Sequence, residues 1–299
     1  MYLGMDFGGT KVAFRAEYGE GAGEGRKGAA ESTFRWPETR TLADDLAVLR
    51  THTRAVRDGL AGTVEAVGVA MPATLDAAGR VVAWPNRPFW EGVDLRAELA
   101  ELLPGARIAC ADDGDLAGLA EADAAGCDHL VYLGVGTGVG GGAVRRGDIL
   151  PGPDRGSCEI GHMVVDRSGE RCDCGRRGCV QAIASGPATL RRASAARGAP
   201  VHFTELRDAY AAGDRWAVEA LDDTCAALAA AATNLGELLR PDRVVIGGGF
   251  AAGIPGLVAE VAARTAKLSR PGTPTPPVHA ARLAGLSSLH GALLLARRA

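Results

Sequence analysis

Two segments of this sequence share one pattern: an apolar run of strand length ends in a cluster of glycines, and a second apolar run follows. In the first, Tyr2–Phe7 is followed by Gly8 and Gly9; in the second, His129–Val135 is followed by the glycine-rich stretch 136–142. Glycine tolerates positive φ, so each segment predicts a strand, a tight turn and a second strand. The chain has 42 glycines in 299 residues without a Gly-X-Y period, which excludes collagen and leaves a globular protein.

Charge and apolar patterning exclude several other classes of protein. The 33 basic residues are balanced by 36 acidic ones, for a formal net charge of −3, which argues against a dedicated nucleic-acid surface. The sequence has no run of about 18 apolar residues, so we expect no membrane span. The first residues lack the basic and apolar regions of a signal peptide. We therefore expect a cytoplasmic protein.

The spacing of apolar residues predicts further helices and strands. We expect helices over Thr41–Ala61, Val93–Leu103, Leu116–Ala125, Asp214–Arg240 and Ser287–Arg298, and strands over Val64–Ala70, Arg107–Ala111, Gly142–Arg145 and Arg243–Ile246.

The order of these elements predicts two related α/β domains that face a cleft, each opened by a glycine hairpin. The smaller domain is expected to comprise residues 1–114 with 287–299, and the larger one residues 115–286. We expect an acidic turn at Asp112–Asp115 and a polar loop between strands at Gly19–Glu31.

Three of the seven cysteines, Cys172, Cys174 and Cys179, lie within one short segment that follows His162. Thiolates and an imidazole are suitable tetrahedral zinc ligands, so the segment predicts a small structural zinc knuckle. A redox pair is the competing interpretation, but C-x-C differs from the C-x-x-C redox signature. The other cysteines are expected to be isolated core thiols: Cys110, Cys127, Cys158 and Cys225.

A third glycine cluster, Gly247–Gly249, follows the strand expected at Arg243–Ile246. Backbone N–H groups at glycines can turn toward a phosphate, so three such clusters at strand ends predict an anion site. Taken singly, each cluster is also compatible with an ordinary hairpin. Gly136, Gly138 and Gly141 match the dinucleotide pattern G-x-G-x-x-G, but no helix is expected after them and no Walker A lysine follows any cluster.

The segment Asp6-Phe7-Gly8-Gly9-Thr10-Lys11 resembles the first phosphate loop of the sugar kinase/actin/heat-shock ATPase superfamily. Gly134–Gly140 resembles its second phosphate loop, and Ile246–Gly249 its adenosine-side loop. The resemblance implies two actin-like (ribonuclease H-like) domains with ATP between them and Mg²⁺ held near Asp6. The nucleotide and magnesium residues it implies are Asp6, Gly8, Gly9, Thr10, Lys11, Gly136, Thr137, Gly138, Gly247, Gly248 and Gly249.

Cys158-Glu159-Ile160-Gly161-His162-Met163, followed by C-x-C-G-x-x-G-C, resembles the signature of the ROK family of repressors and sugar kinases. The resemblance runs from Asp6 to Gly291. It implies that His162, Cys172, Cys174 and Cys179 bind zinc, which fixes the loop that presents Glu159 to the substrate. It also implies a homodimer or homotetramer.

Asp113 occupies the position of the catalytic aspartate of ROK kinases, in the stretch Asp112-Asp113-Gly114-Asp115. By this resemblance it accepts the proton of the attacking sugar hydroxyl. The alternative is that the clustered aspartates only cap the next helix, for which Asp115 is the better candidate.

The expected substrate pocket departs from the family pattern at three positions. Asp112 replaces an asparagine, Gln181 a glutamate and Ala73 a glycine, whereas Glu159 and His162 are retained. An aspartate only accepts hydrogen bonds, while asparagine and glutamine also donate, so the pocket should discriminate against the ordinary substrate. Trp84 and Trp90 either belong to the core or stack on a sugar. The substrate residues implied are Asp112, Asp113, Glu159, His162, Gln181, Ala73 and Asn86.

These features predict an ATP-dependent kinase that phosphorylates a hydroxyl of a sugar or sugar-like polyol other than plain glucose. We expect the primary hydroxyl to be the one that is phosphorylated. Another hexose, an amino or modified sugar and a C7-cyclitol all stay open as substrates, and an ordinary glucokinase is the simpler alternative. Polyphosphate is an alternative donor. A sugar-responsive repressor is disfavoured because the first phosphate strand begins at Tyr2, which leaves no room for a helix-turn-helix domain. A catalytically inactive sugar-binding protein is disfavoured by the intact Asp6 and Asp113.

Overall fold

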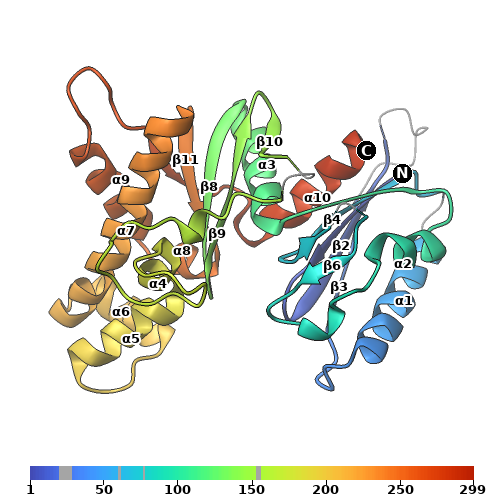
Figure 1. The fold of residues 1–299 in the computed structure, drawn as a ribbon, viewed down its shortest axis with the longest axis horizontal. Coiled ribbons are helices and arrows are strands. Elements are labelled where there is room, and N and C mark those ends of the chain that lie inside the picture. The colour runs from blue at the N-terminus through green and yellow to red at the C-terminus, as the bar shows by residue number, and fades with distance from the viewer. Residues whose placement is uncertain (20–28, 60–61, 77, 153–155) are drawn as a thin grey trace. The chain divides into compact units, whose positions relative to one another are not determined.

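The computed structural model describes residues 1–19, 29–59, 62–76, 78–152 and 156–299 (Figure 1). Contacts divide the chain into two compact units. The first unit is Met1–Ala120, Pro151–Ser157 and Leu286–Ala299, and the second is Glu121–Leu150 and Cys158–Gly285. This division differs from the predicted one: the boundary falls after Ala120, and Pro151–Ser157 groups with the first unit.

The first unit is built on a five-stranded sheet in the order β3-β2-β1-β4-β7. The strands are β1 (Tyr2–Phe7), β2 (Lys11–Glu17), β3 (Ala29–Arg35), β4 (Ala66–Ala70) and β7 (Arg107–Ala111). Strands β1, β2 and β3 pair antiparallel, whereas β4 is parallel to both β1 and β7. Small elements and helices complete the unit: β5 (Thr74–Leu75), β6 (Val81–Ala83), α1 (Leu42–Gly59), α2 (Leu95–Leu102), η1 (Pro88–Trp90) and α10 (Ser287–Arg298). The short helix η4 (Ala284–Leu286) precedes α10, and only its last residue is assigned to this unit.

Helix α10 packs directly on β4 at a glycine. A Cβ atom added to Gly68 would lie 1.8 Å from the carbonyl oxygen of Ala292, so only glycine permits this approach. On the same helix, Gly291 faces Leu116 near the start of α3 (Asp113–Ala125), where an added Cβ would lie 2.0 Å from the Leu116 carbonyl oxygen. This packing explains why the first residues of α3 group with the first unit.

The second unit repeats the arrangement with a sheet in the order β10-β9-β8-β11-β12. Its strands are β8 (His129–Val135), β9 (Val139–Arg145), β10 (Asp148–Leu150), β11 (Arg243–Gly247) and β12 (Val278–Ala280). Strands β8, β11 and β12 are parallel, while β9 is antiparallel to β8 and β10. The helices are η3 (Ile160–His162), α4 (Val180–Ala184), α5 (Gly186–Arg197), α6 (Phe203–Ala212), α7 (Arg215–Leu239), α8 (Gly249–Ala252) and α9 (Leu257–Lys267). Among the helices that the structure describes, none combines the length and apolar character needed to cross a membrane.

The long strands and helices agree with the sequence analysis, but three local predictions were wrong. Val139–Gly141 belong to β9, which begins three residues before the expected strand, because they pair with β8. Asp113–Asp115 open α3 instead of forming a turn. Ala29–Glu31 were expected in a loop but begin β3. Residues 20–28 of that expected loop lie outside the described residues, as do Leu60 and Ala61 of the first expected helix. For Trp84 and Trp90 the structure supports the first of the two expected alternatives, because both are buried in the core.

Replacing Gly68 by alanine should destabilise the protein by about 3 kcal/mol, since the new methyl group overlaps the backbone of α10. Gly59→Ala is the matched control: Gly59 ends α1, and an added Cβ meets no atom within 4 Å. That control should be neutral or slightly stabilising. Urea unfolding of the two variants measures the difference, and equal stabilities would contradict the packing argument.

Candidate functional site

Acidic side chains meet at one edge of the first unit's sheet. Strands β1, β4 and β7 are parallel, so their carboxyl ends lie together. Asp6 is near the end of β1, and Asp112 and Asp113 follow β7. The Asp112 carboxylate accepts a hydrogen bond from the backbone N–H of Gly114 at 2.9 Å, so Asp112, and not Asp115 as expected, caps α3.

The pKa values of both Asp6 and Asp113 are raised. Burial and the negative charge of Asp113 raise the pKa of Asp6 to about 7, although the charge of Lys11 opposes the shift. Burial also raises the pKa of Asp113, although hydrogen bonds from the backbone N–H groups of Gly114 and of Asp113 itself lower it. Two such carboxyl groups favour a cation or a transferable proton between them.

The first glycine loop, Gly8–Lys11, connects β1 and β2 beside these acids. The N–H of Gly8 donates to the carbonyl of Lys11 at 2.9 Å, and the indole N–H of Trp36 donates to the carbonyl of Gly8 at 2.8 Å. A Cβ atom on Gly9 would lie 3.0 Å from the side-chain nitrogen of Asn86. Asn86, a predicted substrate residue, therefore lies against this loop, whereas Ala73 is half-buried against the core between β4 and β5.

In the second unit, the second glycine loop (Gly136–Gly138) and the third (Gly247–Gly249) come together. Both follow parallel strands, β8 and β11. Gly248 has φ +86°, and a Cβ atom there would lie 2.4 Å from the carbonyl oxygen of Val135. The two predicted nucleotide loops of this unit thus share one edge of its sheet.

Gln181, on α4, reaches the second glycine loop. Its side-chain oxygen accepts a hydrogen bond from the N–H of Val139 at 3.4 Å, and a Cβ atom on Gly138 would lie 2.9 Å from that oxygen. Gly161 packs on the same strand, where an added Cβ would lie 1.8 Å from the carbonyl oxygen of Val139. The structure therefore brings Gln181 to the same strand end as the segment that contains His162.

The predicted metal ligands converge. One ligand atom each from His162, Cys172, Cys174 and Cys179 lies within 4.8 Å of the others, and the Cys172 sulfur is 3.6 Å from Nδ1 of His162. The N–H of Arg176 lowers the pKa of Cys174 to about 6, whereas burial raises that of Cys179 to about 12. This donor set and spacing fit a tetrahedral zinc ion.

The carboxylate of Glu159 lies near the cysteine cluster. His162 turns Nδ1 toward the cysteines and places Nε2 4.0 Å from the Glu159 carboxylate. Glu159 is largely exposed, with a side-chain exposure of 69%. The imidazole can thus hold a metal with one nitrogen and face a carboxylate with the other.

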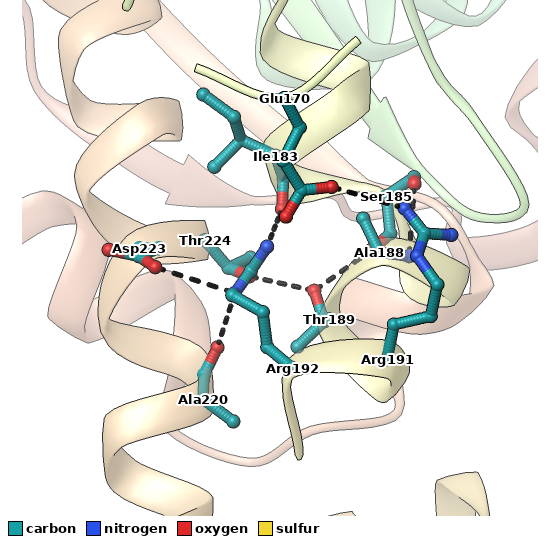
Figure 2. A network of polar contacts seen from close by, with 10 residues as sticks. All are labelled: Glu170, Ile183, Ser185, Ala188, Thr189, Arg191, Arg192, Ala220, Asp223 and Thr224. Carbon is teal, nitrogen blue, oxygen red and sulfur yellow. Dashed lines mark hydrogen bonds and ion pairs between the residues drawn. The ribbon is translucent and has the colours of Figure 1, made fainter. Parts of the chain in front are cut away.

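A polar network holds the junction between α4 and α5 (Figure 2). The guanidinium of Arg192 donates to the carbonyl of Ile183 at 2.7 Å and to the hydroxyl of Thr224 at 2.6 Å. Thr189 shares a hydrogen bond with Thr224 at 2.7 Å. Just beyond the junction, the N–H of Gly186 donates to the carbonyl of Gly136 in the second glycine loop at 2.8 Å.

Sequence reasoning missed the residues that support these loops. Trp36, Arg192 and Gly186 lie outside every motif singled out above. A signal existed only for Gly186, which stands with Pro187 directly after a serine, a typical helix start. The indole and the guanidinium act through tertiary contacts that no local spacing encodes.

Replacing Asp6 by asparagine should stabilise the protein by about 3 kcal/mol at pH 8 in buffer without added magnesium, and by much less at pH 5. Between the unfolded pKa near 4 and the folded value of about 7, the native state holds a proton that the unfolded state has lost. Wild-type stability therefore gains from this group as the pH falls, and asparagine removes that dependence. Urea unfolding at both pH values measures the difference, with the exposed Glu38→Gln as control. The prediction would be contradicted if the free energies of unfolding of wild type and variant differed by the same amount at both pH values.

Comparisons with known proteins identify the family. Residues 2–299 match the model of the ROK family. Kanosamine kinase of Amycolatopsis mediterranei (strain S699) is 54% identical over 295 residues, covering 99% of this chain and 95% of the relative. Glucokinase of Thermotoga maritima is 35% identical over 202 residues, covering 62% of this chain and 63% of the relative. The crystal structure of a ROK hexokinase from Thermus thermophilus is 29% identical, with a TM-score of 0.84 over 99% of this chain and 98% of that one.

These relatives confirm the predicted activity, a kinase that transfers phosphate to a sugar hydroxyl. The protein belongs to the ROK family.

Proposed function

We propose that this protein is an ATP- and magnesium-dependent kinase for an amino sugar of the kanosamine class, with Asp113 as general base. The observation that carries this proposal is the 54% identity, over nearly the whole of both chains, with a kanosamine kinase. Glucokinases match at lower identity and over a smaller part of the chain.

Asp113 has the position and protonation behaviour of a base. It lies at the start of α3, and burial raises its pKa, which makes the ionised carboxylate a stronger proton acceptor. In the proposed reaction it takes the proton of the substrate hydroxyl while that oxygen attacks the γ-phosphorus in line. The primary hydroxyl is the expected nucleophile.

Asp6 fits a role beside magnesium, because a carboxylate destabilised by a neighbouring negative charge gains from a hard cation. The ion would neutralise charge on the β- and γ-phosphates. The glycine loops would present backbone N–H groups to the phosphates, with Lys11 adding a positive charge.

The negative charge of the Asp112 side chain is an argument for a substrate that carries an amino group. One of its oxygens accepts the N–H of Gly114, which fixes the plane of the carboxylate next to Asp113. An ammonium group on the sugar would meet a complementary charge there, whereas a hydroxyl gains less from a carboxylate. Glu159, His162, Gln181 and Asn86 are proposed to supply further contacts to the sugar.

Zinc is proposed to bind His162 and the three cysteines of the knuckle. The four ligand atoms already lie close together, and the thiols are of the type that zinc ligates as thiolates. The role is structural: the ion would fix the side chain of His162 and so the position of Glu159.

A substrate panel with two variants tests the proposed activity. Wild type should phosphorylate kanosamine with a higher kcat/KM than glucose in a coupled ADP-release assay. Asp112→Asn should lower that preference at least tenfold, since it removes the charge that attracts the ammonium group. Asp113→Asn should lower kcat with both sugars by about a thousandfold or more, because the base is lost. Glucose or a C7-cyclitol as the best substrate would overturn the amino-sugar assignment.

Metal analysis tests the zinc assignment. Purified protein should contain about one zinc per chain, and Cys179→Ser should lose the metal and melt at a lower temperature. Cys127→Ser, outside the cluster, is the control and should retain the zinc. Metal content that is unchanged in Cys179→Ser would exclude this site.

A further inference from the structure

Trp36 connects the core of the first unit to the first glycine loop. The residue follows β3 and is only 5% exposed. Its indole N–H donates a hydrogen bond to the carbonyl oxygen of Gly8 at 2.8 Å, and its backbone N–H donates to the carbonyl of Thr10 at 3.1 Å. Trp36 therefore holds the loop at two carbonyl groups, one through its side chain and one through its backbone.

The hydrogen bond to Gly8 fixes the orientation of one peptide group. In a planar trans peptide the C=O and N–H bonds point in opposite directions. The carbonyl of Gly8 and the N–H of Gly9 belong to the same peptide, so the N–H of Gly9 points away from the indole. Two glycines flank this peptide, and without an anchor it can rotate at little steric cost.

A buried ion pair in turn fixes the indole. The guanidinium of Arg87 lies over the Trp36 ring at 4.8 Å and pairs with the carboxylate of Asp45. Arg87 is 4% exposed and Asp45 is fully buried, and the indole N–H of Trp90 donates to the same carboxylate at 2.8 Å. Burying such an ion pair costs desolvation energy that an apolar pair would avoid. We therefore attribute to this pair the role of holding the Trp36 ring in place rather than of stabilising the fold.

The same ion pair places a second residue on the loop. Asn86 directly precedes Arg87, and its side chain lies against Gly9. The guanidinium of Arg40 donates to the backbone carbonyl of Asn86 at 2.6 Å. The residue pair Arg87 and Asn86 therefore reaches the loop twice, through the Trp36 ring and through the Asn86 side chain at Gly9.

We propose that Trp36 is a positioning residue for nucleotide binding: its indole N–H holds the Gly8–Gly9 peptide so that the Gly9 N–H faces the phosphates, and the Asp45–Arg87 pair holds the indole. The inference rests on the proposed function, in which this loop binds phosphate.

The test compares two tryptophans of the same aromatic cluster. Trp36→Phe keeps an aromatic ring and removes the donor to Gly8. Trp84→Phe is the matched control, because Trp84 is also buried and, within the described residues, its indole nitrogen has no hydrogen-bond partner. Both variants lose the same atoms from one core cluster, and only one loses a bond to the loop.

We expect Trp36→Phe to raise the KM for ATP and the calorimetric Kd for AMPPNP about five- to tenfold, the equivalent of one buried hydrogen bond. The KM for the sugar should stay within twofold, and Trp84→Phe should leave all three constants within twofold. A second variant, Arg87→Lys, keeps the charge opposite Asp45 but loses the planar contact with the indole, and should raise the same two nucleotide constants by a smaller factor.

Equal effects of the two tryptophan variants, or an equal rise in the nucleotide and sugar constants of Trp36→Phe, would overturn the inference. Failure of the proposed function gives a different result, because wild type itself would then show no ATP-dependent phosphorylation. AMPPNP binding that is unchanged in Trp36→Phe would reject the positioning role whatever the activity of wild type.

Discussion

Backbone contacts that only glycine permits determine how this protein brings its functional segments together. A Cβ atom at Gly161, Gly178 or Gly248 would lie within 2.4 Å of a backbone oxygen, namely that of Val139, Asp166 or Val135 respectively. Gly161 brings the His162 segment against β9, and Gly248 brings the third glycine loop against β8. Gly178 lets the cysteine knuckle pack on the neighbouring backbone at Asp166. The high glycine content therefore reflects close packing as much as tight turns.

The electrostatics of the first unit follow from strand direction. Because β1, β4 and β7 are parallel, their ends bring carboxyl groups together, and burial, followed by the negative charge of Asp113, raises the pKa of Asp6 to about 7. This arrangement costs stability in the absence of a ligand. Under the proposed function a bound cation would offset this cost, so the charges that lower stability would increase the affinity for the cation.

Sequence reasoning predicted the strands that end in glycine clusters and the cluster of His162 with three cysteines, because short-range patterns encode both. Tyr2–Phe7, Arg107–Ala111, His129–Val135 and Ser287–Arg298 have the bounds expected. The turn at Asp112–Asp115 was wrong because the capping carboxylate of Asp112 starts the helix earlier. The support of the loops by Trp36 and Arg192 was missed, since such contacts join residues far apart in the chain.

Helix α4 has five residues, too few to be stable alone, so its geometry is imposed from its two ends. One end follows Cys179 of the cysteine cluster, and the other is fixed by the Arg192 network. The position of the Gln181 oxygen therefore depends on the residues at both ends of this helix. If Gln181 contacts the sugar as proposed, substitutions at Thr189 or Thr224 offer a route by which selectivity can drift during evolution without any change at Gln181 itself.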